Sequence, residues 1–372
     1  MSITKIEGDD LENIINGACF LGSGGGGGLD TARGIGEILK KYLPLDMCDY
    51  QDVQPYENAA VTAGVGAPSQ WDPTQFKDSS MNSINALQEY SGENISYVIP
   101  GETGAVNSIV PMMVTAGSTN KIPIIDADGA GRAMPVIPMC TFALSGFSTN
   151  PSAIANSEND RMKITAPIAD TLDLQLREIV THDPRFQKVA VVSTFLINGD
   201  EIYRPNAVIP HTLTIAKKVG EALKLETQKD RIEKIIDIMN SYGRKASVLI
   251  EGFITEFTSR AQEGFDCGTV KISQERKNKG HYIEINFVNE NLVAWFPTPG
   301  EKDPIWGPTM LCYMSPQGKP YSNCDLEKLW EEGQRDIPVS IMEISPAKEV
   351  DNATIKMYFK NLYSRFFGRI PG

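Results

Sequence analysis

The sequence predicts a two-domain α/β protein. It would have a three-layer α/β/α domain with a parallel sheet in residues 1–243 and a β-rich, barrel-like domain in residues 244–372. Strand-like apolar runs alternate with amphipathic segments over residues 59–132, and this β-α-β-α-β order favours a parallel sheet with right-handed crossovers. Beyond residue 243, short strand-like segments are separated by Gly, Pro and Asn. The 372 residues, 41% of them hydrophobic, suffice for two well-filled cores.

The first domain begins with two predicted helices joined by a run of glycines. Apolar residues recur at helical spacing over 10–19 and again over 29–39, on either side of Gly22–Gly28. The run contains the spacing G-x-G-x-x-G, but a dinucleotide fingerprint needs a preceding strand, and no Lys-Ser/Thr ending of a Walker loop follows. We therefore expect no nucleotide, and we interpret the run as a wall where backbone comes close to a ligand.

Three strand-and-loop units follow, over residues 59–68, 95–102 and 122–132, with helices over 81–90 and 103–117 between them. In a parallel sheet the loops that leave the carboxyl ends of the strands share one edge, where ligands usually bind. The loops 64–68, 100–102 and 126–132 would meet at that edge. The sequence therefore predicts the site there. Further helices near 171–181, 212–223 and 229–242 and a strand over 188–197 complete the domain.

The third loop carries two aspartates and an arginine. Asp126 and Asp128 could hold a metal, act as a general base or bind a ring N–H, or they could cap nearby amides, as Asp often does in turns. Arg132 suits a substrate carboxylate, because its planar fork binds one bidentately, and the alternative is an ion pair with a neighbouring aspartate.

The second loop carries Glu102 and Asn107. Glu102 precedes a predicted helix, where a carboxylate is also stabilised by the helix dipole without any catalytic role. Asn107 lies one turn further on and could hydrogen-bond a ligand or face solvent. In the second domain, residues 289–291 (Asn-Glu-Asn) lie between two strand-like runs, which by itself indicates a hairpin turn.

Composition restricts the class of partner. The formal net charge of −12 makes nucleic acid and anionic membranes poor partners, and no apolar run is long enough to span a bilayer. The first residues do not resemble a signal peptide, and the six cysteines are scattered, so we expect a cytoplasmic protein with reduced thiols. The three histidines (His182, His211 and His281) do not form a zinc-binding pattern. Cys140 follows the third loop, and we expect a packed thiol there.

Several motifs occur together in a characteristic order: LGSGGGGG, GVGAP, PGETGAVNS, DADGAGRAMP and NENLVA. With these motifs the chain resembles the S-methyl-thiohydantoin desulfurase-like family, which is associated with hydantoinase/oxoprolinase proteins. The resemblance implies the two domains described above and chemistry on a hydantoin-like ring, in which oxygen replaces the sulfur at C2. The chain departs from the pattern at Val106, near which another glycine is expected, and at Val136, where an acidic residue is expected.

These observations lead to the hypothesis of a hydrolase-type desulfurase that acts on a small hydantoin-like molecule. Asp126 or Asp128 would activate water, alone or through a divalent metal, and Glu102 would protonate the leaving group or a ring nitrogen. Backbone N–H groups of Gly22–Gly28 would stabilise the tetrahedral intermediate. Asn107 would read the amide edge of the ring, and Arg132 a substrate carboxylate. The remaining residues predicted to bind substrate are Gly24, Gly25, Gly26, Gly66 and Asn291.

Two other classes are compatible with the same sequence. The glycine loop could act as an anion nest in a phosphate- or nucleotide-dependent enzyme. Alternatively, the acid missing at Val136 could mark a catalytically silent subunit or a small-ligand sensor. The sequence leaves the metal and a homo-oligomeric state open.

Overall fold

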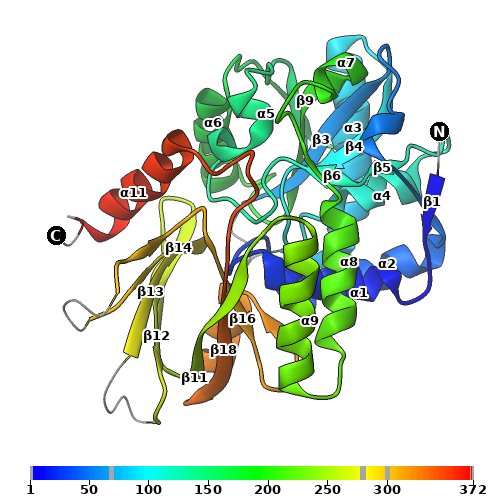
Figure 1. The fold of residues 1–372 in the computed structure, drawn as a ribbon. Helices are drawn as coiled ribbons and strands as arrows, with labels where there is room; N and C mark the ends of the chain where they lie inside the picture. The colour runs from blue at the N-terminus through cyan, green and yellow to red at the C-terminus, as the bar shows by residue number, and fades with distance from the viewer. Residues whose placement is uncertain (1–2, 67–70, 277–281, 298–301, 369, 371–372) are drawn as a thin grey trace.

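The computed structural model describes residues 3–66, 71–276, 282–297, 302–368 and 370. Two eight-stranded sheets organise the chain, one in each predicted half (Figure 1). This arrangement confirms the two-part α/β fold. None of the helices in the described part of the chain is both long and apolar enough to cross a membrane.

The first sheet is mixed, with the strand order β1-β2-β5-β4-β3-β9-β7-β8. The strands β2, β5, β4 and β3 are parallel neighbours, as the β-α-β-α-β pattern predicts. The strand β9 pairs antiparallel with β3, with Asn58 opposite Asn198, and β7 and β8 extend that edge. The parallel prediction therefore holds for the strands that carry the three loops and not for the whole sheet.

Both faces of the first sheet are buried, which produces the three layers. Along β3, Ala60 packs into the core beneath α3 and α4, whereas Val61 packs into the core of the opposite face. The strand β4 alternates in the same way, with Val98 on the first face and Ile99 on the second. This period of two is the geometry of an extended strand covered on both sides.

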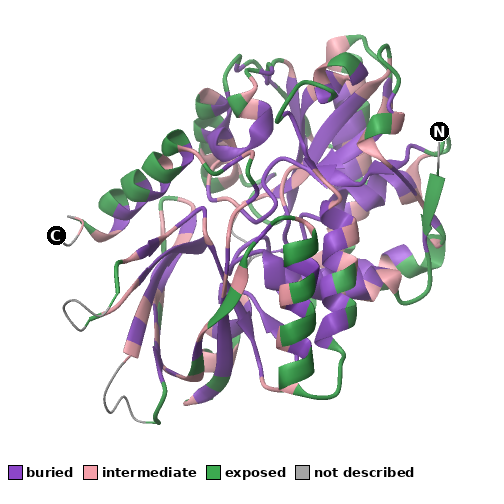
Figure 2. Cartoon of the chain, in the orientation of Figure 1, coloured by how far each residue is buried: buried purple, intermediate pink, exposed green. Residues whose placement is uncertain are grey.

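The second sheet is antiparallel, with the order β15-β14-β13-β12-β11-β18-β16-β17. Helix α11 packs against its β13–β15 end, and α10 contacts β11 and β17. Helices α1, α8 and α9 lie between the two sheets (Figure 1), and Met310 and Met342 of the second sheet share their core. The two halves are therefore joined by a continuous apolar core, although many exposed residues remain on the outer helices (Figure 2).

The segment 103–109 differs from the sequence prediction. Helix α4 begins at Val110, and the preceding residues form turns instead of the first helical turns. In this segment the N–H of Val106 donates to the carbonyl oxygen of Gly26 at 2.9 Å. A Cβ on Gly26 would lie 2.4 Å from the Cα of Gly104, so the two backbones touch. The contacts of residues 103–109 with the glycine run thus compete with helix formation in this segment.

The elements of the first half have the following bounds: β1 Ile3–Ile6, α1 Asp10–Leu21, α2 Leu29–Leu39, β2 Leu45–Cys48, β3 Asn58–Val65, α3 Phe76–Ser91, β4 Ile95–Pro100, α4 Val110–Gly117, β5 Ile124–Ile125, β6 Ala127–Asp128, α5 Thr141–Leu144, β7 Ser152–Ala155, β8 Arg161–Ile164, α6 Ala169–His182, β9 Ala190–Asn198, α7 Gly199–Ile202, β10 Ile209–Pro210, α8 Thr212–Leu223 and α9 Gln228–Ser241. Those of the second half are β11 Ala246–Gln262, β12 Phe265–Ser273, β13 Tyr282–Val288, β14 Glu290–Trp295, β15 Ile305–Trp306, β16 Met310–Met314, β17 Pro320–Tyr321, α10 Asn323–Glu331, β18 Ile337–Ile344 and α11 Ala353–Phe367.

Candidate active site

A cavity opens at the edge where β3 and β4 end, between the two halves of the chain. Gly64 and Gly66 at the end of β3, and Gly101 and Glu102 after β4, line one part of it. The second half contributes Gly264, Asn289 and Glu290. The volume of the cavity is about 150 Å³. Its position is the sheet edge at which the sequence predicts a site. Ala67 and Pro68 of the predicted first loop lie outside the described residues.

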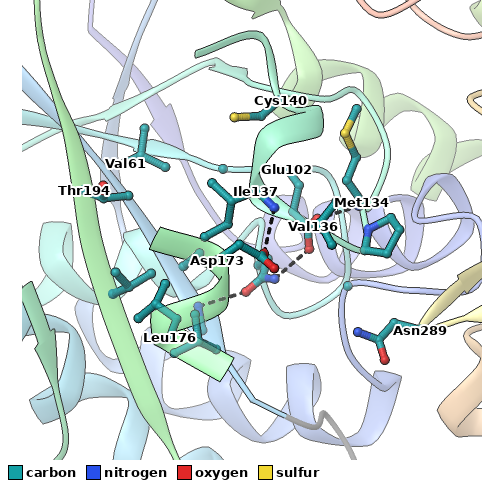
Figure 3. Close-up of a pocket in the computed structure, with 18 of the residues that line it drawn as sticks. Val61, Glu102, Met134, Val136, Ile137, Cys140, Asp173, Leu176, Thr194 and Asn289 are labelled. Carbon is teal, nitrogen blue, oxygen red and sulfur yellow. Dashed lines mark hydrogen bonds between the residues drawn. The ribbon is translucent and has the colours of Figure 1, made fainter. Parts of the chain in front are cut away.

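Glu102 is held in this cavity by two hydrogen bonds (Figure 3). The side-chain amide of Asn107 donates to its Oε1 at 2.7 Å, and the backbone N–H of Met134 donates to its Oε2 at 2.6 Å. Loss of hydration raises the pKa of Glu102 to about 7, although both hydrogen bonds favour the ionised form. This carboxyl group therefore exchanges its proton near neutral pH, as a general acid or base must.

Glu290 is the second carboxyl group in the cavity, at the first residue of β14. Its side chain is 3% exposed, and its Oε2 has no hydrogen-bond partner among the described residues. The backbone N–H of Gly26 donates to the carboxyl group, but burial outweighs this contact and raises the pKa of Glu290 well above its usual value. Burial therefore favours the protonated form of Glu290.

The two carboxyl groups influence each other electrostatically. The charge of Glu102 raises the pKa of Glu290, which is its largest cause after burial. Two carboxylates that share one desolvated site cannot easily ionise together, so ionisation of one disfavours ionisation of the other. The cavity thus holds one carboxyl group that can accept a proton and one that can donate it.

Asn107 positions Glu102. Its Oδ1 accepts from the backbone N–H of Gly64 at 3.0 Å, and its Nδ2 donates to Glu102. The side chain is 7% exposed and lines the cavity. Because both ends of the amide are occupied by the protein, Asn107 connects the ends of β3 and β4 and orients the carboxyl group. A contact of Asn107 with the ring amide stays a prediction.

An ion pair on α6 forms another part of the wall. The Nε of Arg177 donates to Asp173 at 2.8 Å, and its terminal nitrogens donate to the carbonyl oxygens of Pro135 and Gly264 at 2.5 and 3.5 Å. The guanidinium also lies over the ring of Phe265, 3.6 Å from its centre. Asp173 in turn accepts from the backbone N–H of Ile137 at 3.0 Å (Figure 3). The pair therefore fixes the segment 134–137 over the cavity.

Trp71 contributes an indole N–H donor to the cavity. It is 8% exposed, and its indole Nε1–H has no acceptor among the described residues. Its ring packs edge-on against Phe76. A buried N–H without an acceptor costs free energy unless a ligand or water supplies one. Cys140 also lines the cavity, but burial raises the pKa of its thiol to about 12, so it is not a thiolate.

The glycine run approaches the protein's own side chains more closely than it approaches the cavity. A Cβ on Gly25 would lie 2.1 Å from Oε1 of Glu290, and one on Gly24 would lie 2.8 Å from Oδ1 of Asn291. Gly26 lines the cavity, and its N–H is directed to Glu290. The run is a close-approach wall, as predicted, but Glu290 and Asn291 occupy the places that the sequence interpretation gave to a ligand.

Asp126 and Asp128 do not line the cavity. Asp126 accepts from the backbone N–H groups of Leu213 and Thr214 and from the Thr214 hydroxyl, at 2.5–3.0 Å, and so caps the start of α8. Asp128 accepts from the Thr103 hydroxyl and from two backbone N–H groups of its own turn, at 2.5–2.8 Å. These contacts match the capping alternative and leave neither carboxylate placed for catalysis at the cavity.

Arg132 and Asn291 lie behind the cavity wall. Arg132 is 1% exposed and donates to backbone carbonyl oxygens of Ala133, Pro308, Thr309 and Asn291 at 2.9–3.2 Å. Asn291 is fully buried, with its amide bonded to the Leu311 carbonyl and the Tyr313 hydroxyl. The Arg132 side chain connects the two halves of the chain, whereas the Asn291 side chain bonds within the second half, and its backbone reaches the first through the N–H, which donates to the carbonyl oxygen of Ser23, and through the carbonyl oxygen that accepts from Arg132.

The metal prediction has no matching donor set. Within residues 3–66, 71–276, 282–297, 302–368 and 370, no three His, Cys, Asp or Glu side chains form a group that could hold a metal ion. His211 begins α8, with its Nδ1 3.7 Å from carboxylate oxygens of Asp126 and Asp49, and this contact raises its pKa. His281 lies outside the described residues.

Sequence reasoning missed Glu290, Asp173, Arg177 and Trp71 as cavity residues. Glu290 lies inside the NENLVA motif, which the sequence analysis interpreted as a hairpin turn, so its position in the cavity was not predicted. Asp173 and Arg177 look like an ordinary i,i+4 surface pair on a helix. For Trp71, only its nearness to the glycine loop at Gly66 gave a signal.

These features define a two-domain α/β protein with an acid-lined cavity between its halves. The chain matches the family domain described as "S-Me-THD-like, N-terminal domain" over residues 9–166 and the one described as "S-Me-THD-like, C-terminal domain" over residues 169–327. It therefore belongs to the S-Me-THD-like family.

A solved structure shares the fold. It is described as a protein from Chromobacterium violaceum, with a TM-score of 0.79, 23% sequence identity, and coverage of 100% of this chain and 98% of that chain. At this identity the likeness concerns the fold alone. No curated protein matches the sequence.

Proposed function

We propose that the protein is a hydrolase that replaces sulfur with oxygen at C2 of a thiohydantoin-like ring, with the reaction taking place in the cavity between its halves. One observation carries the proposal. The acidic groups Glu102 and Glu290 line the same cavity as the Trp71 N–H, which has no acceptor in the described part of the chain. Membership in the S-Me-THD-like family supports the choice of ring chemistry.

The cavity offers what such a ring requires. A thiohydantoin presents a carbonyl oxygen, ring nitrogens and a flat apolar body within a few ångströms. Trp71 Nε1–H has no acceptor, and Oε2 of Glu290 has no partner, among the described residues. A ring carbonyl would accept from the indole, and a ring nitrogen would accept from the protonated Glu290, which would satisfy both groups.

In the proposed reaction the two carboxyl groups move protons in opposite directions. The Glu102 carboxylate takes a proton from water as the water oxygen bonds to C2, and Glu290 donates its proton to the adjacent ring nitrogen as the C=N double bond becomes single. The tetrahedral intermediate then loses its hydroxyl proton to Glu290. The C–S bond breaks, C2 becomes a carbonyl carbon, and the thiolate takes the proton from Glu102. Water and an S-alkyl thiohydantoin thus give a hydantoin and a thiol, and both carboxyl groups regain their starting states.

A second candidate is ligand binding without turnover. Val136, where the family pattern has an acidic residue, lines the cavity. If that acid supplied an essential proton in relatives, this chain would keep the pocket and lack the reaction. The competing phosphate-dependent class receives less support, because the N–H of Gly26 is directed to Glu290 instead of an open anion site.

The test is a substrate panel. Purified protein is incubated with thiohydantoins and S-methyl thiohydantoins, with and without added divalent metals, and free sulfide or methanethiol is measured. Release of either compound, together with formation of the hydantoin, is the expected result. Binding of these rings without release would favour the silent binding protein, and neither binding nor release would overturn the proposal.

A further inference from the structure

The charged side chains of the cavity bear on which substituent its ligand can carry. Three acidic side chains line it: Glu102, Asp173 and Glu290. Burial favours the protonated, uncharged form of Glu290, and the charge of Arg132, which lies behind the wall, acts on both glutamates. Arg177 is the sole Lys or Arg side chain among the described lining residues. A ligand carboxylate in the cavity would therefore need this one cation as its partner.

That cation is already occupied. Arg177 binds Asp173 through two nitrogens, at 2.8 and 3.3 Å, and donates to the carbonyl oxygens of Pro135 and Gly264. The ring of Phe265 covers one face of the guanidinium. A ligand carboxylate would have to displace Asp173, which is 7% exposed and would be left as a buried charge without its partner.

The arginine that the sequence analysis assigned to a substrate carboxylate is also unavailable. Arg132 donates to four backbone carbonyl oxygens behind the wall and does not line the cavity. Val136 adds a further apolar surface to the lining. Neither Arg132 nor Val136 therefore provides a group that would recognise an anion.

The side of the cavity away from the two glutamates is apolar. Leu176 and Val180 of α6, Val192 of β9 and Ala63 and Val65 of β3 line it and belong to one apolar cluster. In Figure 3, Leu176 and Val61 lie on one side of Asp173, and Glu102 and Asn289 lie on the other. A ring held beside the glutamates would thus direct its substituent toward aliphatic side chains.

We infer that the substrate is a thiohydantoin-type ring with an uncharged, apolar substituent, such as a branched alkyl or benzyl group, and that the cavity excludes rings with a carboxylate side chain. This inference rests on the proposed function and specifies its substrate class. Rejection would arise from the desolvation of a carboxylate that finds no free cation among the described lining residues, while affinity would come from burial of the substituent among Leu176, Val180 and Val192.

The test compares three hydantoins by isothermal titration calorimetry with the wild-type protein, since hydantoins carry oxygen at C2 and are not turned over. The substituents at C5 are isobutyl, 2-carbamoylethyl and 2-carboxyethyl; the last two have the same shape and differ in charge. At pH 7.5 we expect the isobutyl compound to bind at least ten-fold more tightly than the carboxylate, with the amide between them. Equal or tighter binding of the carboxylate than of the amide would overturn this inference alone. No binding by any of the three would overturn the inference together with the proposed function.

A matched pair of variants tests the electrostatic cause. Val180→Lys places a cation at the partly exposed rim of the apolar side, whereas Gln175→Lys adds the same charge to the exposed face of α6, away from the cavity. We expect Val180→Lys to shift the carboxylate-to-amide affinity ratio toward the carboxylate by at least five-fold, and Gln175→Lys to shift it less than two-fold. An equal shift in both variants would overturn the local electrostatic account.

Discussion

Two pairs of acidic residues differ in how far the protein fills their hydrogen-bonding capacity. Asp126 follows β5 and Asp128 ends β6, and their carboxylate oxygens accept from amides and hydroxyls of α8, of Thr103 and of the following turn. Glu102 and Glu290 line the cavity, and burial raises the pKa of both, as it also does for Asp128. One oxygen of Glu290 has no partner in the described part of the chain.

The contrast shows which buried carboxyl groups remain available for chemistry. A carboxylate whose lone pairs are filled by the protein stabilises a turn or a helix start, and moving its proton would break those contacts. A desolvated carboxyl group with unfilled capacity is costly for folding and is retained where a ligand completes it. In this protein the aspartates have the first role, and we propose the second role for the glutamates.

We expect the largest effect for Glu290, the proposed proton donor of the Glu102–Glu290 pair. Glu290→Gln keeps the shape of the side chain and an acceptor for the Gly26 N–H but removes the acidic proton. Release of methanethiol should fall by about 10²–10⁴-fold, the range typical of a lost general acid. Asp126→Asn is the control and should stay within about three-fold of the wild type. A Glu290→Gln variant with full activity would remove Glu290 from the mechanism.

A variant of Arg132 tests whether this side chain connects the two halves of the chain or contacts the substrate. Arg132→Met removes the donors to four backbone carbonyl oxygens, of which three belong to residues 291–309. We expect a loss of about 3 kcal/mol in the free energy of unfolding, measured with a chemical denaturant. The affinity of the folded variant for 5-isobutylhydantoin should change by less than three-fold. A variant of normal stability that binds no hydantoin would restore Arg132 as a ligand contact.

Gly25 tests whether the glycine run is shaped around Glu290. Gly25→Ala would place a methyl group 2.1 Å from Oε1 of Glu290, so we expect a loss of about 2 kcal/mol in stability. In a double-mutant cycle, Glu290→Ala should relieve most of this loss because it vacates the space. Additive losses would show that the run is constrained by something other than this side chain.

The smallest effect is a pH dependence of stability. The pKa of Glu102 is raised from its usual 4.5 to about 7 in the folded state, so between these values the folded protein binds more protons than the unfolded chain. This group therefore destabilises the fold progressively as pH rises from 4.5 to 7, on the order of 1 kcal/mol after allowance for its partial exposure. Denaturant unfolding at a series of pH values should show a shallower decline in Glu102→Gln than in wild type. Parallel curves would contradict the raised pKa.

The sequence predicts the architecture well where one element determines the next. The helices beside the glycine run and the parallel strands β3, β4 and β5 follow from apolar periodicity. The antiparallel insertion of β9 does not, because a strand's own pattern does not reveal its neighbour's direction. The shortened α4 also depends on a distant partner, the carbonyl oxygen of Gly26.

The sequence predicts where the cavity lies but not all of the residues that line it. The cavity lies at the edge to which the strand ends point, and Glu102 and Asn107 line it. We propose catalytic importance for Glu290 in place of Asp126 because of one structural property, namely which hydrogen bonds the fold fills. That property depends on α8 reaching Asp126 and on β14 carrying Glu290 into the cavity, and both contacts join segments far apart in sequence.

We propose that the glutamates, and not the aspartates, transfer the protons of the reaction. The most direct measurement is the rate of methanethiol release from an S-methyl thiohydantoin with an isobutyl substituent, compared between Glu102→Gln and Asp128→Asn. We expect the rate of methanethiol release to fall by at least about 100-fold in Glu102→Gln, whereas folded Asp128→Asn should keep activity within ten-fold of the wild type. Full activity in Glu102→Gln together with loss of activity in a folded Asp128→Asn would contradict the proposed role of the glutamates.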